Sequence, residues 1–468
     1  MLTTFETESR KYEVALNSEY KKSMGIFYTD SKLAVLMLSE LSELITKETK
    51  IIDPTCGSGI FLKVAIEKGY KNVYGTDIDK GAVKFAGEFI PEAKILKLDS
   101  LSLTYDEVLK SFKTRERFDL VIGNPPYAPI SKDNQILTSD YLFLRTVSAT
   151  GDNLFNASLI RARDLVKEGG IISYIIPKNF LHVNSYSLLR RDILRDFTIL
   201  TIVDIGKYFK KVKGEQIILT IKKGRVSNSM IAFKKLNNDS FELKTLIDQS
   251  FYNDEIVFFD SNEDFNIYNK LKNTYSTLSD IAQGYIGRGR SKDNDAISGR
   301  DIRKFGLKVG SPLREGNQIF IQNIYSAESG IIACFGGNLK ASETVTVFTD
   351  GDPKMCRYVL GILHSRLCNF YLQKYAFNSS KLTMHVDSKY LKKIPFLVDT
   401  SLFDVVLEYV DLLENSEYMS EKWFSHYERL NSLVYRLYGI SKDEIEFIEH
   451  RVRSVQSRKW DINERKES

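Results

Sequence analysis

The chain has 468 residues, of which 43% are hydrophobic, 27% charged and 12% aromatic. This composition is typical of a globular protein of two or three domains and excludes a disordered or collagen-like chain. No stretch approaches the roughly 18 unbroken apolar residues of a membrane span, and residues 1–10 lack the apolar core of a secretory signal. The four scattered cysteines predict neither a disulfide framework nor a zinc site, so we expect a cytoplasmic protein.

The positive charge is concentrated in one part of the chain. The whole sequence has 66 Lys and Arg against 61 Asp and Glu, a formal net charge of +5. Residues 280–400 alone hold about 17 basic and about 11 acidic residues, an excess of roughly +6, so the remainder is close to neutral. A basic segment beside a neutral one favours a polyanionic partner, although an ordinary lysine-rich surface would give the same count.

Short apolar runs alternate with helical patterns between residues 50 and 222. Seven runs rich in β-branched residues predict strands at 51–52, 73–74, 95–96, 120–122, 171–176, 199–203 and 217–221. Helical periodicity predicts helices between several of them, as at 61–68 and 154–166. This alternation indicates an α/β fold with a doubly wound, mostly parallel sheet. The last two runs have no helix between them, so they predict a hairpin and one antiparallel strand.

The pattern changes three times along the chain. Residues 1–225 form the predicted α/β domain, and the polar, Asn- and Asp-rich residues 226–277 are interpreted as a bridge. Residues 278–400 are mixed in pattern and carry the basic excess, whereas residues 401–468 are helical in their spacing of apolar side chains. We therefore expect a second, mixed α/β domain with a helical end.

A glycine-containing loop follows the first predicted strand. Its sequence, residues 53–59, is Asp-Pro-Thr-Cys-Gly-Ser-Gly, and glycines there allow a tight turn and a close approach of a ligand. Asp53 is placed to accept from an ammonium group, and Asp77 ends the second strand, where an acid binds the two hydroxyls of a ribose. The third glycine of the dinucleotide pattern is missing, which disfavours NAD. Asp99 ends the third strand and is either an adenine contact or a turn residue.

The fourth predicted strand runs directly into Asn124, Pro125, Pro126 and Tyr127. The prolines fix φ and remove two N–H donors, and Asn124 adds a side-chain carbonyl. Two acceptors converging on one amino group suit the methylation of a nitrogen whose lone pair is delocalised into a ring. Tyr127 supplies a flat face on which an extruded base can stack.

With these motifs in this order, the chain resembles the γ class of N6-adenine DNA methyltransferases of restriction–modification systems. The segment 25–29, Gly-Ile-Phe-Tyr-Thr, resembles the family's N-terminal motif, although the family usually has Pro where Asp30 stands. The resemblance implies a seven-stranded Rossmann-like methyltransferase domain, S-adenosylmethionine as the cofactor and no metal. It places Asn124, Pro125, Pro126 and Tyr127 in the catalytic motif. The implied cofactor site consists of Thr29, Asp53, Thr55, Cys56, Gly57, Gly59, Asp77, Ile78, Asp99, Ser100 and Asn124.

The same resemblance extends to the substrate. Residues 208–216 resemble the motif whose Phe packs on the flipped adenine, so Phe209 and Tyr127 would sandwich the base, with Phe209 as ordinary core as the alternative. Residues 278–400 resemble a DNA target-recognition domain, and duplex DNA is the implied partner. The candidate DNA contacts, each of which can equally be a solvated surface residue, are Lys178, Arg288, Arg290, Arg300, Arg303 and Lys304.

Other functions fit the residues less well. A C5-cytosine enzyme needs a cysteine that typically follows proline, and none of the four does. An N4-cytosine enzyme more often has Ser in place of Asn124, and RNA or glutamine methyltransferases would leave the basic second domain unexplained. A DNA-binding protein without turnover would be expected to lack Asn124, Tyr127 or Asp77. We expect a monomeric modification enzyme, with any restriction endonuclease acting as a separate protein.

Overall fold

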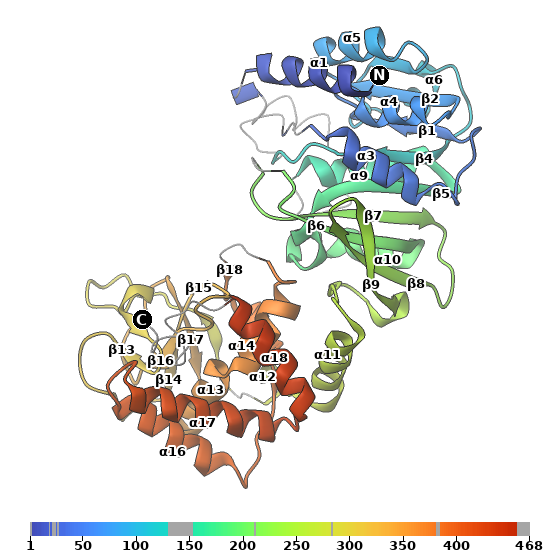
Figure 1. Cartoon of the computed structure of the whole chain (residues 1–468). Helices are drawn as coiled ribbons and strands as arrows, with labels where there is room; N and C mark the ends of the chain where they lie inside the picture. The colour runs from blue at the N-terminus through green and yellow to red at the C-terminus, as the bar shows by residue number, and fades with distance from the viewer. Residues whose placement is uncertain are drawn as a thin grey trace. The chain divides into compact units, whose positions relative to one another are not determined.

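The computed structural model describes residues 2–17, 19–20, 25, 28–129, 153–209, 212–281, 284–380 and 384–455. It divides into two compact units, Met1–Asp260 and Ser261–Ser468. Each unit has its own sheets and its own core (Figure 1).

The first unit has helices on both faces of a large sheet (Figure 1). Its helices are α1 (Leu2–Ala15), α3 (Ser31–Glu40), α4 (Ile60–Glu67), α5 (Lys80–Phe89), α6 (Tyr105–Ser111), α9 (Leu154–Leu165) and α10 (Ser187–Asp196), with short turns η1 (Lys178–Leu181), η2 (Asn184–Tyr186) and η3 (Gln249–Phe251). Its strands are β1 (Lys50–Asp53), β2 (Asn72–Asp77), β3 (Lys94–Lys97), β4 (Phe118–Gly123), β5 (Val166–Pro177), β6 (Phe197–Gly206), β7 (Gln216–Lys223), β8 (Met230–Asn237) and β9 (Ser240–Asp248).

All seven predicted strands are present, in the order β3-β2-β1-β4-β5-β7-β6. The first five are parallel to one another, and β7 runs antiparallel to both β5 and β6, as the absence of a predicted helix between the last two strands indicated. The order reverses between β1 and β4, and ligands of such sheets bind outside the strand ends at this reversal.

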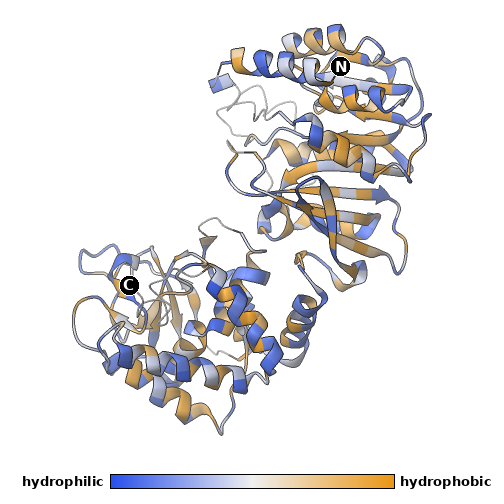
Figure 2. Cartoon of the chain, viewed as in Figure 1, coloured by the Kyte–Doolittle hydropathy of each residue, from blue (hydrophilic) through white to orange (hydrophobic). Residues whose placement is uncertain are grey.

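The strands are buried on both faces, which explains why they are continuous apolar runs in the sequence. Leu120 and Ile122 of β4 pack into one hydrophobic cluster with α3, α4 and α5, while Val121 between them points to the opposite face and is equally buried. Hydrophobic residues are accordingly concentrated in the strands of this sheet (Figure 2).

The interval that we interpreted as a bridge differs from expectation. Residues 230–248 form β8 and β9, and β8 pairs in parallel with β6, so the described sheet has nine strands rather than seven. The division between the units falls after Asp260, inside the expected bridge. The two added strands lie at the edge of the sheet and are half exposed, which makes their sequence polar and their periodicity weak.

The second unit is mixed α/β with a helical end, as predicted. Its helices are α11 (Asn262–Thr274), α12 (Leu278–Ile281), η4 (Gly299–Asp301), α13 (Pro353–His364), α14 (Arg366–Tyr371), η5 (Leu372–Ala376), α15 (Ser388–Lys392), α16 (Phe403–Asn415), α17 (Glu421–Leu437) and α18 (Lys442–Val455). Its strands are β10 (Ser276–Thr277), β11 (Ile286–Arg288), β12 (Ile302–Arg303), β13 (Gly306–Leu307), β14 (Gln318–Gln322), β15 (Ile324–Tyr325), β16 (Ala333–Phe335), β17 (Val345–Thr349), β18 (Met384–His385) and β19 (Pro395–Phe396).

An antiparallel sheet of four strands, β11-β17-β14-β16, is the largest sheet among the described residues of the second unit. Helix α13 packs on β14 and β16 and also against α16. Phe320, Cys334 and Val345 are fully buried in the small core of this sheet. Throughout the described part of the chain, no helix combines the length and the apolar character that crossing a membrane would take.

Candidate functional site

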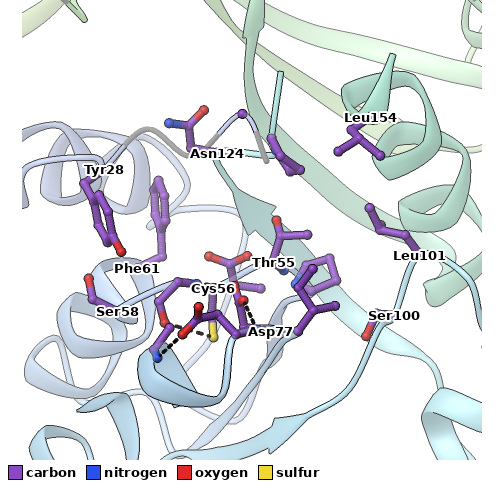
Figure 3. Close-up of a pocket in the computed structure, with 18 of the residues that line it drawn as sticks. Tyr28, Thr55, Cys56, Ser58, Phe61, Asp77, Ser100, Leu101, Asn124 and Leu154 are labelled. Carbon is purple, nitrogen blue, oxygen red and sulfur yellow. Dashed lines mark hydrogen bonds between the residues drawn. The ribbon is translucent and has the colours of Figure 1, made fainter. Parts of the chain in front are cut away.

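A deep pocket opens at the carboxyl ends of β1, β2, β3 and β4 in the first unit (Figure 3). The segments that follow these strands contribute Asp53, Asp77, Asp99 and Asn124 to its wall. The pocket is partly open to solvent, and its lining combines apolar side chains with a few polar groups, as is typical of small-molecule sites. It lies at the reversal of strand order, where the sequence predicted a cofactor site.

The loop between β1 and α4 forms the floor of this pocket. Gly59 directly precedes α4 with φ +89, a left-handed conformation that strains other residues, and a Cβ there would lie 2.7 Å from Ile90 Cδ1, so the Ile90 side chain would have to shift. The backbone N–H of Gly57 donates to Asp77 Oδ2 at 2.7 Å, and the N–H of Cys56 donates to the Thr76 carbonyl at 2.9 Å. These bonds tie the loop to β2 and fix the predicted cofactor residues beside one another.

Two buried carboxyl groups face the pocket. Asp53 is 1% exposed, and burial raises its pKa to about 8, although its Oδ1 accepts from the Thr55 N–H at 3.1 Å. Burial also raises the pKa of Asp77, against the hydrogen bonds that its carboxylate accepts from Asp79 and Gly57. Both groups would be stabilised in their charged form by a cationic or hydrogen-bond-donating ligand.

Further features of the wall suit a ligand with polar and flat parts. Thr55 Oγ1 is buried and has no hydrogen-bond partner within the described structure, so a polar ligand atom would satisfy it. Ile78 lies on the wall and is 42% exposed, a wide apolar surface on which a flat ring can pack. Asp99 accepts from the backbone N–H of Leu101 at 3.0 Å, so it caps the turn after β3 and also lines the pocket. Ser100 is buried beside it.

The Asn-Pro-Pro-Tyr motif forms the side of the pocket that follows β4. Asn124 Nδ2 donates to Thr29 Oγ1 at 3.3 Å, which joins this motif to the segment 25–29. The Tyr127 hydroxyl lies 2.8 Å from Asn124 Oδ1 and 2.8 Å from the Ile175 carbonyl oxygen. Both groups of the Asn124 carboxamide are therefore engaged by protein atoms, and its orientation is fixed.

The remaining residues of the motif are close by. Pro125 is buried, and Pro126 lines the pocket together with Asn124. The ring of Tyr127 meets the edge of Phe155, with centroids 6.4 Å apart and planes at 90°. Phe209 is half-buried against the core of the first unit and contacts Tyr208 edge-on at 5.4 Å. The sandwich of a base between Phe209 and Tyr127 remains a prediction.

Asp30, where the resembling family usually has proline, has two structural functions. Its Oδ1 accepts from the backbone N–H of Leu33 at 2.9 Å, so it caps the N-terminus of α3. Its Oδ2 accepts from the Tyr208 hydroxyl at 2.7 Å. Asp30 thus links the N-terminal motif to the segment that contains Phe209, and a proline at this position could not make these hydrogen bonds.

Two of the predicted DNA contacts lie in the interior. Lys178 is buried and its Nζ forms an ion pair with Asp204 at 2.8 Å. Lys304 is 3% exposed, its Nζ lies 5.4 Å from the centre of the Tyr427 ring, and burial lowers its pKa to about 7. These surroundings do not favour the phosphate contacts that we expected, because a phosphate cannot reach a buried ammonium group without rearrangement of the core.

The four arginine candidates lie nearer the surface of the second unit. Arg290 and Arg300 are exposed, and Arg288 is exposed but pairs with Asp387 at 2.9 Å. Arg303 is half-buried, with its guanidinium 5.1 Å from the centre of the Tyr418 ring. Contacts of these four residues with DNA remain predictions.

The pocket wall also contains residues that the sequence reasoning missed. Leu16, Tyr20, Tyr28, Phe61 and Asp79 all line it. Asp79 could have been identified from the sequence as a helix cap near the site, because it lies two residues beyond Asp77 and immediately before a helical pattern. In the described part of the chain, no group of three or more His, Cys, Asp or Glu side chains is arranged to hold a metal ion.

Comparison with known proteins identifies the type of domain. Residues 87–210 match the family model of the Eco57I restriction-modification methylase, and residues 32–131 match that of the ribosomal protein L11 methyltransferase PrmA. The type II methyltransferase M.VspI of Vibrio sp. strain 343 is 29% identical over 44% of this chain and 50% of its own length. M.TthHB8I of Thermus thermophilus is 26% identical over 43% of this chain and 46% of its own. The matches thus span about half the length of these relatives.

One solved structure is similar over almost the whole chain. The type IIL restriction-modification enzyme MmeI, determined in complex with DNA, aligns with a TM-score of 0.57 over 96% of this chain and 81% of its own, at 11% identity. This likeness supports the fold of both units.

The residues of the pocket fit S-adenosylmethionine. This molecule carries positive charge on its sulfonium and ammonium groups, and the wall contains the buried carboxyl groups of Asp53 and Asp77. Its ribose hydroxyls can donate to Asp77, its adenine can pack on Ile78, and the unsatisfied Thr55 hydroxyl is available to a polar atom. Over residues 87–210 the chain is thus similar to restriction-modification methylases, it has type II methyltransferases among its relatives, and this similarity implies S-adenosylmethionine as the cofactor.

Proposed function

We propose that this chain transfers a methyl group from S-adenosylmethionine to N6 of an adenine flipped out of duplex DNA. One observation carries the proposal: Asn124 and Pro126 form part of the wall of the same pocket as the cofactor acids Asp53 and Asp77. An amino group held at Asn124 would therefore lie next to the bound methyl donor, as direct transfer requires.

The side chains around Asn124 suit the activation of an aromatic amino group. The lone pair of this nitrogen is delocalised into the ring, and two acceptors that bind its N–H groups favour a more tetrahedral, nucleophilic nitrogen. Asn124 Oδ1 is one such acceptor and the carbonyl of Pro125 is the other. Neither Pro125 nor Pro126 has an N–H, so no backbone donor at these positions competes for the two acceptors.

Tyr127 holds the Asn124 carboxamide ready before the base enters. A phenolic hydroxyl has one hydrogen, yet Asn124 Oδ1 and the Ile175 carbonyl both lie 2.8 Å from it. The base amino group can replace the hydroxyl at Asn124 Oδ1 while the hydroxyl keeps its bond to Ile175. This exchange leaves every polar atom paired and costs less than uncovering an unpaired carbonyl.

S-adenosylmethionine supplies an electrophilic methyl group when it is bound. The protein positions the amino nitrogen, fixes its hydrogen bonds and excludes water, so catalysis rests on orientation and electrostatics rather than on a covalent enzyme intermediate.

The second unit is the proposed DNA-recognition part. It contains the basic interval 280–400, and the fold of the whole chain is similar to that of MmeI, whose structure contains DNA. The exposed Arg290 and Arg300 are the best placed of the predicted contacts. We further propose that the protein acts as a monomer and as the modification enzyme of a restriction–modification system, with a separate endonuclease as its counterpart.

Replacement of Asn124 by alanine tests the proposal. Loss of one positioned hydrogen-bonding group typically lowers kcat about 10²- to 10³-fold, whereas DNA affinity should stay largely intact, since most of the proposed DNA contacts are phosphate contacts of the second unit. Methyl transfer from labelled S-adenosylmethionine and DNA binding are measured on the same preparations. Turnover close to wild type in Asn124→Ala would contradict the role assigned to this residue.

The same assay separates the alternatives. N4-methylation of cytosine would keep the cofactor pocket and change only the base. Because a putative protein N5-glutamine methyltransferase of Methanocaldococcus jannaschii is 26% identical over 32% of this chain and 71% of its own length, a glutamine-containing protein substrate is the second candidate, and labelled protein in place of DNA would favour it. A DNA-binding protein without turnover would bind DNA and label none of the substrates.

A further inference from the structure

Helix α1 is firmly attached beside the cofactor pocket. Phe5 of α1 is buried in the core of the first unit, and Tyr12 stacks on Phe85 of α5 with ring centroids 5.7 Å apart. Ser9 Oγ donates to Ser58 Oγ at 2.7 Å, a buried bond to the loop that forms the pocket floor. The helix therefore contacts both the loop after β1 and the helix after β2.

Two tyrosines from this N-terminal segment converge on one carboxylate. The Tyr12 hydroxyl donates to Asp79 Oδ1 at 2.7 Å, and the Tyr20 hydroxyl donates to Asp79 Oδ2 at 3.0 Å. Oδ1 also accepts from the Ala82 N–H at 2.7 Å and caps α5. Burial opposes ionisation of Asp79, but these hydrogen bonds outweigh it and lower its pKa, so the carboxylate is charged at neutral pH.

One of these tyrosines and the carboxylate border the pocket. Leu16, Tyr20 and Asp79 line it together with Asp77, the predicted ribose contact, and Ile78, another predicted cofactor residue. Tyr12 packs closely on the first turn of α5, because a Cβ at Gly81 would lie 2.7 Å from the Tyr12 hydroxyl oxygen. A ligand that occupies this end of the pocket thus lies against the N-terminal segment.

We propose that Tyr12, Tyr20 and Asp79 form a clasp that holds the N-terminal segment, whose Leu16 and Tyr20 line the pocket, in place beside it and slows the release of S-adenosylmethionine. The clasp rests on the cofactor assignment and not on the identity of the methylated base. Its two bonds are made to an ionised acceptor, and such bonds are about twice as strong as neutral ones. Removal of one bond should favour the undocked helix about tenfold and raise the dissociation rate of the cofactor by the same factor.

The test uses the full-length protein and three variants, Tyr12→Phe, Tyr20→Phe and Asp79→Asn. Each Phe variant removes one hydroxyl and keeps the ring. Dissociation of labelled S-adenosylmethionine is followed after addition of excess unlabelled cofactor, and hydrogen exchange of residues 2–15 reports the docking of α1. Tyr105→Phe is the matched control, because Tyr105 begins α6 and is not among the residues that line the pocket.

The clasp predicts about tenfold faster dissociation in Tyr12→Phe and Tyr20→Phe, faster exchange in α1, and no change in Tyr105→Phe. Asp79→Asn combined with Tyr20→Phe should be less than additive, because the amide keeps one oxygen for the Ala82 N–H and Tyr12 and places an NH2, which cannot accept, opposite Tyr20, so both changes remove the same bond. Unchanged dissociation with faster exchange would overturn the proposal, and so would unchanged exchange. Since Asp79 also caps α5, the two Phe variants decide the outcome if Asp79→Asn fails to fold. Failure of the wild type to bind the cofactor would refute the clasp as well as the cofactor assignment, whereas failure to methylate adenine would leave the clasp intact.

Discussion

Gly123 leaves no space for a side chain between the ends of β1 and β4. A Cβ at this position would lie 2.7 Å from Asp53 Oδ1 and 3.0 Å from its Cγ, whereas ordinary contact begins at 3.4 Å. In Gly123→Ala the Asp53 carboxyl group must therefore retreat by about 0.7 Å. Gly123 is not among the described glycines with positive φ, so the effect comes from this contact and not from backbone strain.

The expected cost follows from the burial of Asp53. Overpacking of a filled interior typically costs about 1–3 kcal/mol, and Asp53 is 1% exposed with little room to move. If most of this cost falls on cofactor binding, the Kd for S-adenosylmethionine rises roughly 5- to 150-fold, since each 1.4 kcal/mol is a factor of ten.

Isothermal titration calorimetry measures the affinity and thermal unfolding measures the stability. Gly87→Ala is the matched control, because Gly87 lies within α5 and an added Cβ there meets nothing within 4 Å. The control should gain about 0.5–1 kcal/mol of stability from the better helix former and keep its affinity. Wild-type affinity and wild-type stability in Gly123→Ala would refute the account of how Asp53 is positioned.

Three further predictions follow from individual side chains. Tyr127→Ala should weaken binding of the extruded base, so a 2-aminopurine placed at the target should show altered fluorescence relative to wild type; unchanged fluorescence would contradict the stacking role. Asp53 has a folded-state pKa of about 8, above its unfolded value near 3.8. Between these pH values the folded protein keeps the proton that the unfolded chain has lost. The stability of the fold therefore decreases as the pH rises from about 4 to about 8. Binding of a cationic cofactor should strengthen as the pH rises towards 8, and Asp53→Asn should flatten that profile in calorimetry. Lys304 has a pKa lowered to about 7 from 10.5, so the unfolded chain binds more protons between these values and stability should increase with pH there. Lys304→Met should remove this slope and raise the melting temperature at neutral pH, and an unchanged slope would assign the pH dependence to other groups.

The strands of the first sheet were predictable because they are buried on both faces. Ile51, Leu120 and Ile172 belong to continuous apolar runs, whereas a strand with one exposed face would alternate apolar and polar residues. Continuous runs of this kind identify central parallel strands. Strands β8 and β9 were missed because one of their faces meets solvent, which leaves Met230 and Leu246 exposed among polar neighbours.

The candidate site was predictable for a related reason. Parallel strands align their carboxyl ends, so Asp53, Asp77 and Asn124 could be placed together from the ends of their strands. The contacts of Asp79 with Tyr12 and Tyr20 join positions 67 and 59 residues apart, and no local pattern records such a contact. Burial of a single lysine is equally hidden in a sequence, because Lys is nearly always exposed unless it has a partner.

Nucleoside analysis of methylated DNA tests the central claim most directly. Purified protein is incubated with labelled S-adenosylmethionine and unmethylated duplex DNA, and the DNA is digested and its nucleosides separated. We expect the label in N6-methyladenine. Label in N4-methylcytosine would contradict the assigned base, and the absence of label from DNA would contradict the proposed function of the second unit.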